Sequence, residues 1–144
     1  MIAVDLNLLL YAHNTAVPQH AAARSWWEGL MNGAGDIGLP EPVLYGFLRV
    51  TTQRGILATP LATEEALAIV RGWLDWPRVR VLYGTAGSVR HALELAATLG
   101  VAGRLTTDLQ ITALALEYRA TLHSADTDFA RMPGLRWSNP IARR

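Results

Sequence analysis

Four aspartates fall at positions where a parallel sheet would bring them together. Asp5 ends an apolar strand pattern near the start of the chain, and Asp126 and Asp128 directly follow another one. Asp108 opens the helix pattern that leads into that later strand. Open parallel sheets bind ligands beyond the carboxyl ends of their strands, at the point where the strand order reverses. We therefore expect these acids, although far apart in the sequence, to converge on one spot.

Converging carboxylates repel each other, and without a cation at least one of them would have to take up a proton. A hard divalent ion removes that conflict, and ligand sets made only of oxygens select Mg²⁺ or Mn²⁺. Such an ion lowers the pKa of a bound water and stabilises charge on a phosphoryl oxygen. The pattern of acids therefore predicts the chemistry of phosphodiester hydrolysis.

Each acid also has a structural interpretation. Asp108 could simply favour the N-terminus of its helix, an effect of about 0.3–1 kcal/mol. Asp126 and Asp128 could make local hydrogen bonds in a turn. Asp5 is the hardest to explain in this way, because an ionised carboxylate buried without a partner is strongly destabilising. Only the joint pattern favours a functional site.

Other metal and catalytic chemistries are disfavoured. The chain has no cysteine, which excludes a thiolate metal site and fits a reducing cytosol, so we expect a cytoplasmic protein. Four histidines are present, and they lack the paired spacing of a zinc site: His13, His20, His91 and His123. Neither a Walker-type phosphate loop nor a G-x-S-x-G elbow occurs, which argues against an NTPase and a serine hydrolase.

The elements that must position the acids are short apolar strands alternating with helices. Strands are predicted over residues 2–6, 36–40, 79–83 and 120–124, with a final edge strand over 135–140. Helices are predicted over residues 7–14, 18–32, 40–54, 63–76, 86–99 and 108–118, with Thr63 as one N-cap and Thr106–Thr107 as another. This alternation predicts an α/β three-layer sandwich with a mostly parallel central sheet and helices on both faces.

Length and composition predict one domain over residues 1–144, because the chain shows no linker, repeat or low-complexity run. Hydrophobic residues make up 51% and charged residues 17%, which excludes disorder. The formal net charge is +1, without the basic excess of proteins that grip long duplexes. No signal peptide or membrane-spanning run is apparent, so no membrane partner is expected.

Several segments resemble PIN domains, and most closely the VapC-type toxins of the mycobacterial kind. They are VDLNLLLYAHN at the start, TTDLQITALALEY in the last third and LHSADTDFARMPGLRW near the end. The segment GLPEPVLYGFLRVTT resembles the same subgroup, in which an apolar helix carries an arginine before a pair of threonines. The resemblance covers essentially the whole chain.

This resemblance implies a PIN-like fold and an endoribonuclease that depends on Mg²⁺, with Mn²⁺ as the alternative ion. It also implies the toxin component of a VapBC-type toxin–antitoxin pair, with RNA as substrate, a VapB-like antitoxin as partner and a homodimer. Asp5, Asp108 and Asp126 match the catalytic, metal-binding acids, and Asp128 matches a further acid beside them. Asn7 and Thr107 match polar positions that support these acids by hydrogen bonds.

The sequence departs from the family inside the helix that carries Arg49. PIN domains usually have a glutamate in this helix, and the position aligns here with the apolar Leu44. Glu41 lies about one turn earlier and could take the metal-binding role of that glutamate. Alternatively, Glu41 serves only as a first-turn acid that favours the helix N-terminus, and the role of the glutamate is then unfilled. Arg49 could bind a phosphate or pair with a buried acid.

Two other functions remain open. The missing glutamate could leave a catalytically weak or inert PIN-like scaffold that binds RNA or protein. The other alternative is a different Mg²⁺-dependent nuclease or phosphatase on a similar sheet. The tryptophans could stack on bases, although core positions are more usual for them. We expect the apolar helices near Trp26 and Phe47 to offer contact surfaces for partners.

Overall fold

The computed structural model describes residues 1–143, and its centre is a five-stranded sheet. The strands are β1 (Ile2–Val4), β2 (Ile37–Pro40), β3 (Val79–Leu82), β4 (Thr121–His123) and β5 (Trp137–Ser138). They lie in the order β3-β2-β1-β4-β5, and all neighbouring pairs are parallel. The predicted α/β class is confirmed, and the sheet is parallel throughout rather than mostly so.

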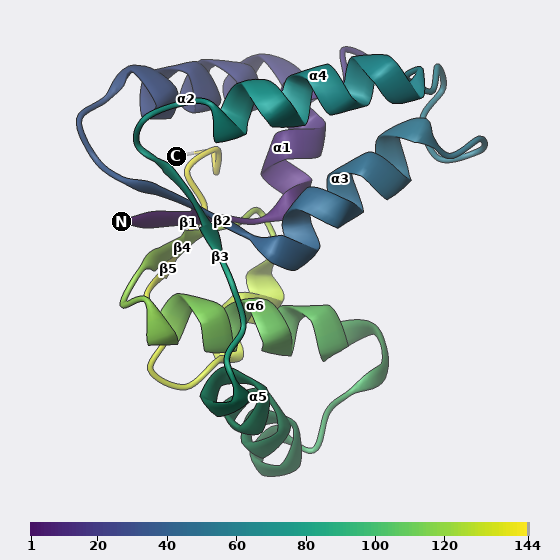
Figure 1. Cartoon of the computed structure of the whole chain (residues 1–144). Helices are drawn as coiled ribbons and strands as arrows, with labels where there is room; N and C mark the ends of the chain where they lie inside the picture. Colours follow the sequence, from purple (N-terminus) through teal and green to yellow (C-terminus); the bar gives the residue numbers. More distant parts are fainter. Residues whose placement is uncertain (144) are drawn as a thin grey trace.

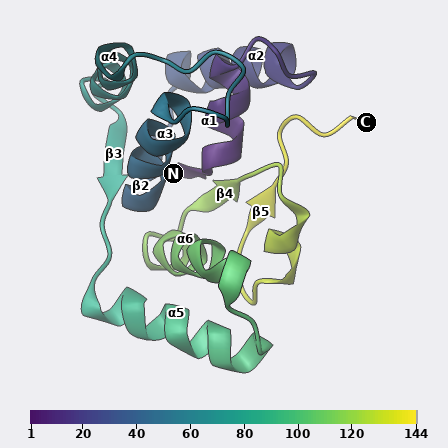
Figure 2. The ribbon, with the colours of Figure 1, turned by 90° about the vertical axis from the view of Figure 1, so that its right-hand side faces the viewer.

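Helices cover both faces of this sheet, as the three-layer prediction requires (Figure 1). On one face lie α1 (Leu6–His13), α2 (His20–Asn32), α3 (Glu41–Thr52) and α4 (Thr63–Leu74). On the other face lie α5 (Ala86–Leu99) and α6 (Thr106–Glu117), with α6 between the sheet and α5 (Figure 2). Two short 3₁₀ segments, Gly103–Leu105 and Thr127–Arg131, precede α6 and follow β4. Among the described residues, no helix is both long and apolar enough to cross a membrane.

An aromatic cluster fills the core between the sheet and the first four helices. Phe47 and Trp73 pack edge-to-face with their ring centroids 4.7 Å apart, and Trp27 meets Trp73 at 5.7 Å. All three side chains are buried, so this cluster serves packing rather than base stacking. Phe47 itself offers no exposed side-chain area to a partner, and the expectation that the helices near Trp26 and Phe47 form contact surfaces stays a prediction.

Several helix boundaries differ from the predicted ones by one or two residues. Helix α4 begins at Thr63 itself, and Glu65 accepts a hydrogen bond from the backbone N–H of Ala62, the residue before the helix. Helix α6 begins at Thr106, because the 3₁₀ turn before it leads directly into the helix. Asp108 consequently lies within the first turn of α6 instead of opening it.

The strand order reverses beside β1, and this places the two strand ends that carry acids next to each other. The chain moves outward from β1 to β2 and β3, then returns to fill the other side with β4 and β5. Val4 pairs with His123 in the parallel register of β1 and β4. The residues that follow, Asp5 and Ser124, therefore lie side by side at the carboxyl edge of the sheet, where such sheets bind ligands.

Candidate active site

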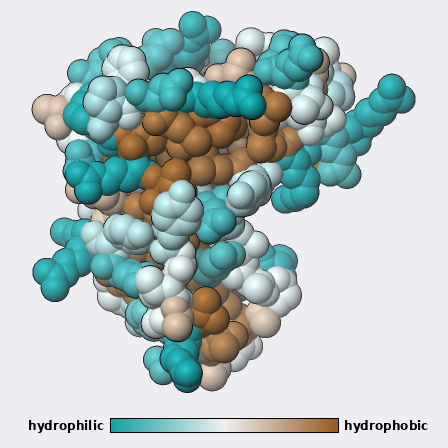
Figure 3. Space-filling view, viewed as in Figure 1, coloured by the Kyte–Doolittle hydropathy of each residue, from teal (hydrophilic) through white to brown (hydrophobic). Residues whose placement is uncertain are grey.

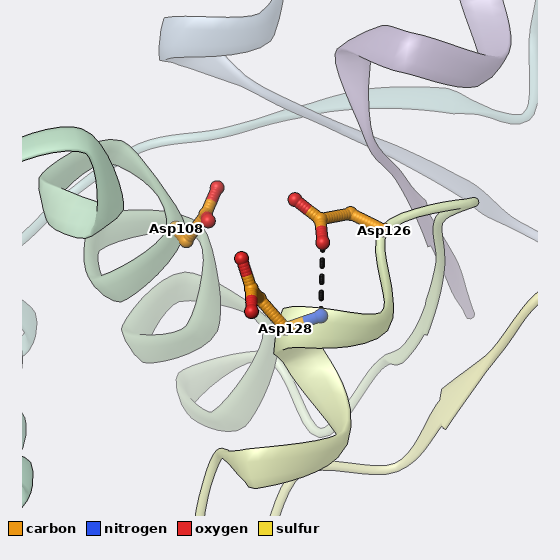
Figure 4. A group of neighbouring side chains, drawn as sticks. All are labelled: Asp108, Asp126 and Asp128. Carbon is orange, nitrogen blue, oxygen red and sulfur yellow. Dashed lines mark hydrogen bonds between the residues drawn. The ribbon is translucent and has the colours of Figure 1, made fainter.

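Three aspartates converge at this edge from two separate elements. Asp108 extends from the first turn of α6, while Asp126 and Asp128 flank the start of the 3₁₀ segment after β4 (Figure 4). One carboxylate oxygen from each lies within 4.8 Å of the others. Asp126 caps the 3₁₀ segment, since its Oδ1 accepts the backbone N–H of Asp128 at 2.8 Å. The local turn thereby fixes both of its acids toward Asp108.

Asp5 lies beside this group, but hydrogen bonds engage both of its oxygens. Its Oδ1 accepts the backbone N–H of Leu6 at 2.7 Å, which caps α1, and its Oδ2 accepts the hydroxyl of Ser124 at 2.6 Å. Burial raises the pKa of Asp5, the bonds from Ser124 and Leu6 oppose this rise, and the charge of Asp126 adds to it. Asp5 is thus a buried acid that joins β1, α1 and β4 and lines the same cleft as Asp108 and Asp126.

Ser124 connects these acids, and the sequence reasoning missed it. Its fully buried hydroxyl donates to Asp5 and accepts from Asn7 Nδ2 at 3.1 Å and from the backbone N–H of Asp126 at 3.0 Å. Asn7 also accepts the backbone N–H of Ala125 through its Oδ1 at 3.2 Å. Asn7 therefore supports the acids through Ser124 rather than by direct contact. The available signal was a serine that ends a buried strand in register with Asp5.

The cluster concentrates negative charge, and Asp108 shows this most strongly. Partial burial, followed by the charges of Asp5, Asp126 and Asp128, raises the pKa of Asp108 to about 6, against the lowering effect of Arg104. Arg104 pairs with Asp128 at 2.9 Å from the exposed rim. A divalent cation would relieve this repulsion, and the all-oxygen donor set fits Mg²⁺ or Mn²⁺.

The raised pKa of Asp108 predicts how the stability of the metal-free protein depends on pH. The carboxyl binds its proton more tightly in the folded chain, at about 6, than at its ordinary value of 3.8. The free energy of unfolding therefore falls as the pH rises from about 4 through about 6, and it stays lower above that range. In EDTA, we expect Asp108→Asn to melt at a higher temperature than the parent at pH 7.5 and at the same temperature near pH 4. An equal melting temperature at pH 7.5 would contradict the proposed charge repulsion.

The acids form one side of an open cleft of about 690 Å³, whose other side is α3. Arg49 reaches this cleft from α3 with an exposed side chain. Within residues 1–143 its guanidinium makes no ion pair or hydrogen bond to a protein group. The pairing of Arg49 with a buried acid is therefore wrong for these residues, and the phosphate-binding alternative remains. Thr107 also lines the cleft, on the α6 side.

The structure does not bring Glu41 to the acids. Glu41 and Leu44 line a separate pocket of about 190 Å³ between α3, α4 and β3. Pro42, Gly46 and Arg49 line the acidic cleft instead, because residues three or four apart share one face of a helix. Of Leu44 and Gly46, only Gly46 lies on the face of α3 that lines the acidic cleft.

A side chain at Gly46 would require the side chain of Leu6 to shift. A Cβ added at Gly46 would lie 2.8 Å from Cδ2 of Leu6, so α1 and α3 approach each other closely at this point. Among the described residues lining the cleft, α3 contributes a cation and no carboxylate.

His123, which lies nearest to the acids among the histidines in the sequence, has a structural role. Its Nδ1 accepts the indole N–H of Trp26 at 3.2 Å, and the two rings pack with their centroids 5.8 Å apart. Burial lowers the pKa of His123, which favours the neutral ring that this bond requires.

Comparison with known proteins yields close relatives over the full chain. Residues 2–135 match the PIN domain family. The chain is 51% identical to Ribonuclease VapC33 of Mycobacterium tuberculosis over 144 residues, which cover 98% of this chain and 99% of that protein.

Solved structures share the fold at low sequence identity. VapC20 of M. tuberculosis, described as a sarcin-ricin loop cleaving toxin, has a TM-score of 0.71 at 19% identity over 94% of this chain and 99% of that one. VapBC2 of Rickettsia felis, solved with a promoter DNA fragment, has a TM-score of 0.69 at 22% identity over 96% and 98% of the two chains. Both likenesses show a common architecture.

Proposed function

Since the chain belongs to the PIN-domain family, and within it to the VapC-type toxins of the mycobacterial kind, we propose that it is a metal-dependent endoribonuclease and the toxin half of a toxin–antitoxin pair. The observation that carries the proposal is the convergence of Asp108, Asp126 and Asp128 beside the buried Asp5. The relative at 51% identity bears the name of a ribonuclease, which supports RNA as the substrate.

In this proposal Asp108, Asp126 and Asp128 hold Mg²⁺ or Mn²⁺, and Asp5 supports the site from the strand end. When bound, the ion lowers the pKa of a coordinated water and stabilises charge on a phosphoryl oxygen. The carboxylates of the cluster orient the attacking water and accept its proton. Attack by water in line with the leaving 3′-oxygen gives products with 5′-phosphate and 3′-hydroxyl ends.

Cleavage of a labelled structured RNA tests this function. We expect cutting with Mg²⁺ or Mn²⁺ and none with EDTA, and no comparable hydrolysis of DNA or a simple phosphomonoester. A preference for either of these other substrates would favour a different Mg²⁺-dependent nuclease or phosphatase.

The inert scaffold remains the second candidate, because Gly46 leaves α3 without a carboxylate in the cleft. Thermal melting in a Mg²⁺ titration separates the two functions. Metal bound only by the folded state stabilises it by about 2.7 kcal/mol when the free ion reaches 100 times its dissociation constant. A scaffold without a metal site shows no such shift and cuts no RNA.

Arg49 provides a prediction about substrate binding. In the proposed site its guanidinium contacts a non-bridging phosphate oxygen from the wall opposite the acids. We expect Arg49→Ala to raise KM for RNA about 10-fold and Arg49→Lys to recover part of this loss, because lysine keeps the charge but not the bidentate geometry. Steady-state kinetics measure both effects, and Arg54→Ala, on an exposed loop residue, is the control. An unchanged KM in Arg49→Ala would exclude a phosphate contact.

We also propose the two protein partners that the family suggests. The VapBC2 complex supports a VapB-like antitoxin, which would place a segment in the cleft and cover the acids. The second partner is another copy of the chain, in a homodimer. Co-expression with the product of the neighbouring gene, followed by copurification and the cleavage assay, tests the antitoxin: it should bind the toxin and suppress cutting.

A further inference from the structure

Arg104 places a positive charge directly against the acidic cluster. Its Nη1 donates to Oδ2 of Asp128 at 2.9 Å, and Asp128 is one of the three aspartates whose oxygens converge. Burial and the neighbouring acids raise the pKa of Asp108, and the charge of Arg104 opposes this rise. The guanidinium group therefore acts on two of the acids that are proposed to hold the metal ion.

The backbone around Arg104 holds this residue at the rim without help from its side chain. Gly103 adopts a left-handed conformation with a φ of +58°, and the buried Leu105 donates its backbone N–H to the carbonyl of Ala102 at 3.1 Å. Arg104 lies in the 3₁₀ turn that leads directly into α6, four residues before Asp108. Residues with this spacing share one side of a helical segment, so the turn presents Arg104 beside Asp108.

The side chain of Arg104 contributes little to the fold. It is 77% exposed, and exposed ion pairs such as the one with Asp128 add little to the free energy of unfolding. Among residues 1–143, Nη1 is the only side-chain nitrogen of Arg104 that donates to a protein group. A guanidinium group has further N–H donors on Nε and Nη2, so Arg104 can bind another anion.

The charges at the cleft must suit a polyanionic substrate. Asp5 and the three converging aspartates carry four negative charges when ionised, and one divalent ion neutralises two of them. The guanidinium groups of Arg49, on α3, and Arg104, beside the acids, match the remaining two. Figure 3 shows that the surface is hollowed between α3 and the start of α6. An RNA strand that follows this hollow passes between the two arginines.

We propose that Arg104 binds the RNA backbone and that it competes with the metal ion for Asp128. When Asp128 ligates the ion, its carboxylate holds Arg104 less strongly, and the guanidinium group pairs with a non-bridging oxygen of a phosphate beside the one that is cut. This inference rests on the proposed metal-dependent nuclease and adds a second cation to its substrate-binding surface.

Titration with Mg²⁺ and with Mn²⁺, followed by thermal melting without RNA, tests the competition. We expect Arg104→Gln to bind both ions about two- to fivefold more tightly than the parent, because the variant removes a positive charge and a competing donor from Asp128. Weaker binding of the ions by Arg104→Gln would overturn the proposal, since Arg104 would then serve to order Asp128 as a ligand.

Arg131→Gln is the matched control for the loss of one positive charge. Arg131 is exposed on the 3₁₀ segment that contains Asp128, and it makes no ion pair among the described residues. Its variant should bind both ions with nearly the parental affinity. Equal tightening in Arg131→Gln and Arg104→Gln would indicate a general effect of charge and contradict the competition for Asp128.

Steady-state cleavage of a labelled RNA at saturating Mg²⁺ tests the phosphate contact. We expect Arg104→Gln to raise KM about fivefold and to keep kcat within about twofold of the parent, because Arg104 binds the substrate outside the bond that breaks. Arg104→Lys keeps the charge and should recover most of this loss. Arg90→Gln changes an exposed arginine on α5, outside the acidic cleft, and should leave KM unchanged. A lower kcat with a parental KM would contradict the contact with RNA.

The two measurements separate this inference from the nuclease on which it rests. If the parent binds no Mg²⁺ and cuts no RNA, the proposed function fails and the role of Arg104 fails with it. If the parent binds the ion and cuts RNA while Arg104→Gln matches it in both ion affinity and KM, the nuclease stands and only the inference about Arg104 is wrong.

Discussion

Asp108→Asn is expected to lower kcat for RNA cleavage at saturating Mg²⁺ by about 1000-fold or more, equivalent to about 4 kcal/mol of transition-state stabilisation. The substitution removes one of three converging carboxylates while keeping the size of the side chain. Asp108 makes no side-chain hydrogen bond to another described residue, whereas Asp5 and Asp126 each accept one that orders the local backbone. Asp108→Asn therefore separates loss of the metal site from loss of structure. Single-turnover cleavage of labelled RNA measures the effect.

Asp36→Asn is the matched control, because it changes the same residue type at the surface. Asp36 pairs with Arg80 at 3.4 Å, with both side chains substantially exposed, and it lies outside the acidic cleft. We expect this variant to cleave RNA at the parental rate. Parental cleavage by Asp108→Asn would exclude the proposed metal site, and equal losses in both variants would indicate a nonspecific effect of charge.

The second large effect is on folding, at Phe47. Phe47→Ala should lower the free energy of unfolding by about 3–5 kcal/mol, because truncating a fully buried phenylalanine leaves a cavity that the core cannot fill. Its ring packs edge-on against Trp73 and His13, at 4.7 and 5.5 Å between centroids, and these contacts hold α3 against α4 and α1. Urea denaturation measures the loss, and the same variant should cleave RNA poorly because α3 forms one side of the cleft.

Tyr45→Ala on the same helix controls for helix propensity and residue size. Tyr45 is 65% exposed, so its removal should change the free energy of unfolding by about 0.5 kcal/mol or less. If Phe47→Ala were as stable as Tyr45→Ala, then α3 would not depend on the aromatic cluster for its position.

The order and type of the elements were predictable because the hydrophobic period changes along the chain. Apolar runs flanked by turn residues marked the strands, and helical spacing marked the segments between them. The convergence of the acids followed from the same alternation, since parallel strands share one carboxyl edge. Boundaries were less well predicted: local capping signals at Thr63 and Thr107 compete with neighbouring positions that the structure uses instead.

The rotation of α3 about its own axis could not be predicted from the chain. Leu44 and Gly46 lie only two residues apart, yet one lines the pocket next to α4 and the other faces the acids. Which of them faces the cleft depends on how Phe47 fits among the aromatic rings and on how closely Leu6 approaches Gly46. The placement of Glu41 away from the acids has the same cause.

The sequence by itself determined the fold class and the residue types of the site, because both depend on periodicity and on where acids follow strands. Only the tertiary structure decided which oxygens meet, that Ser124 joins Asp5 to Asp126, and that Arg49 lies opposite the acids. These features join residues far apart in the chain; Asp5 and Ser124, for example, are 119 positions apart. Contacts of this range depend on strand register and helix rotation, which arise from packing of the whole core and have no local pattern in the chain.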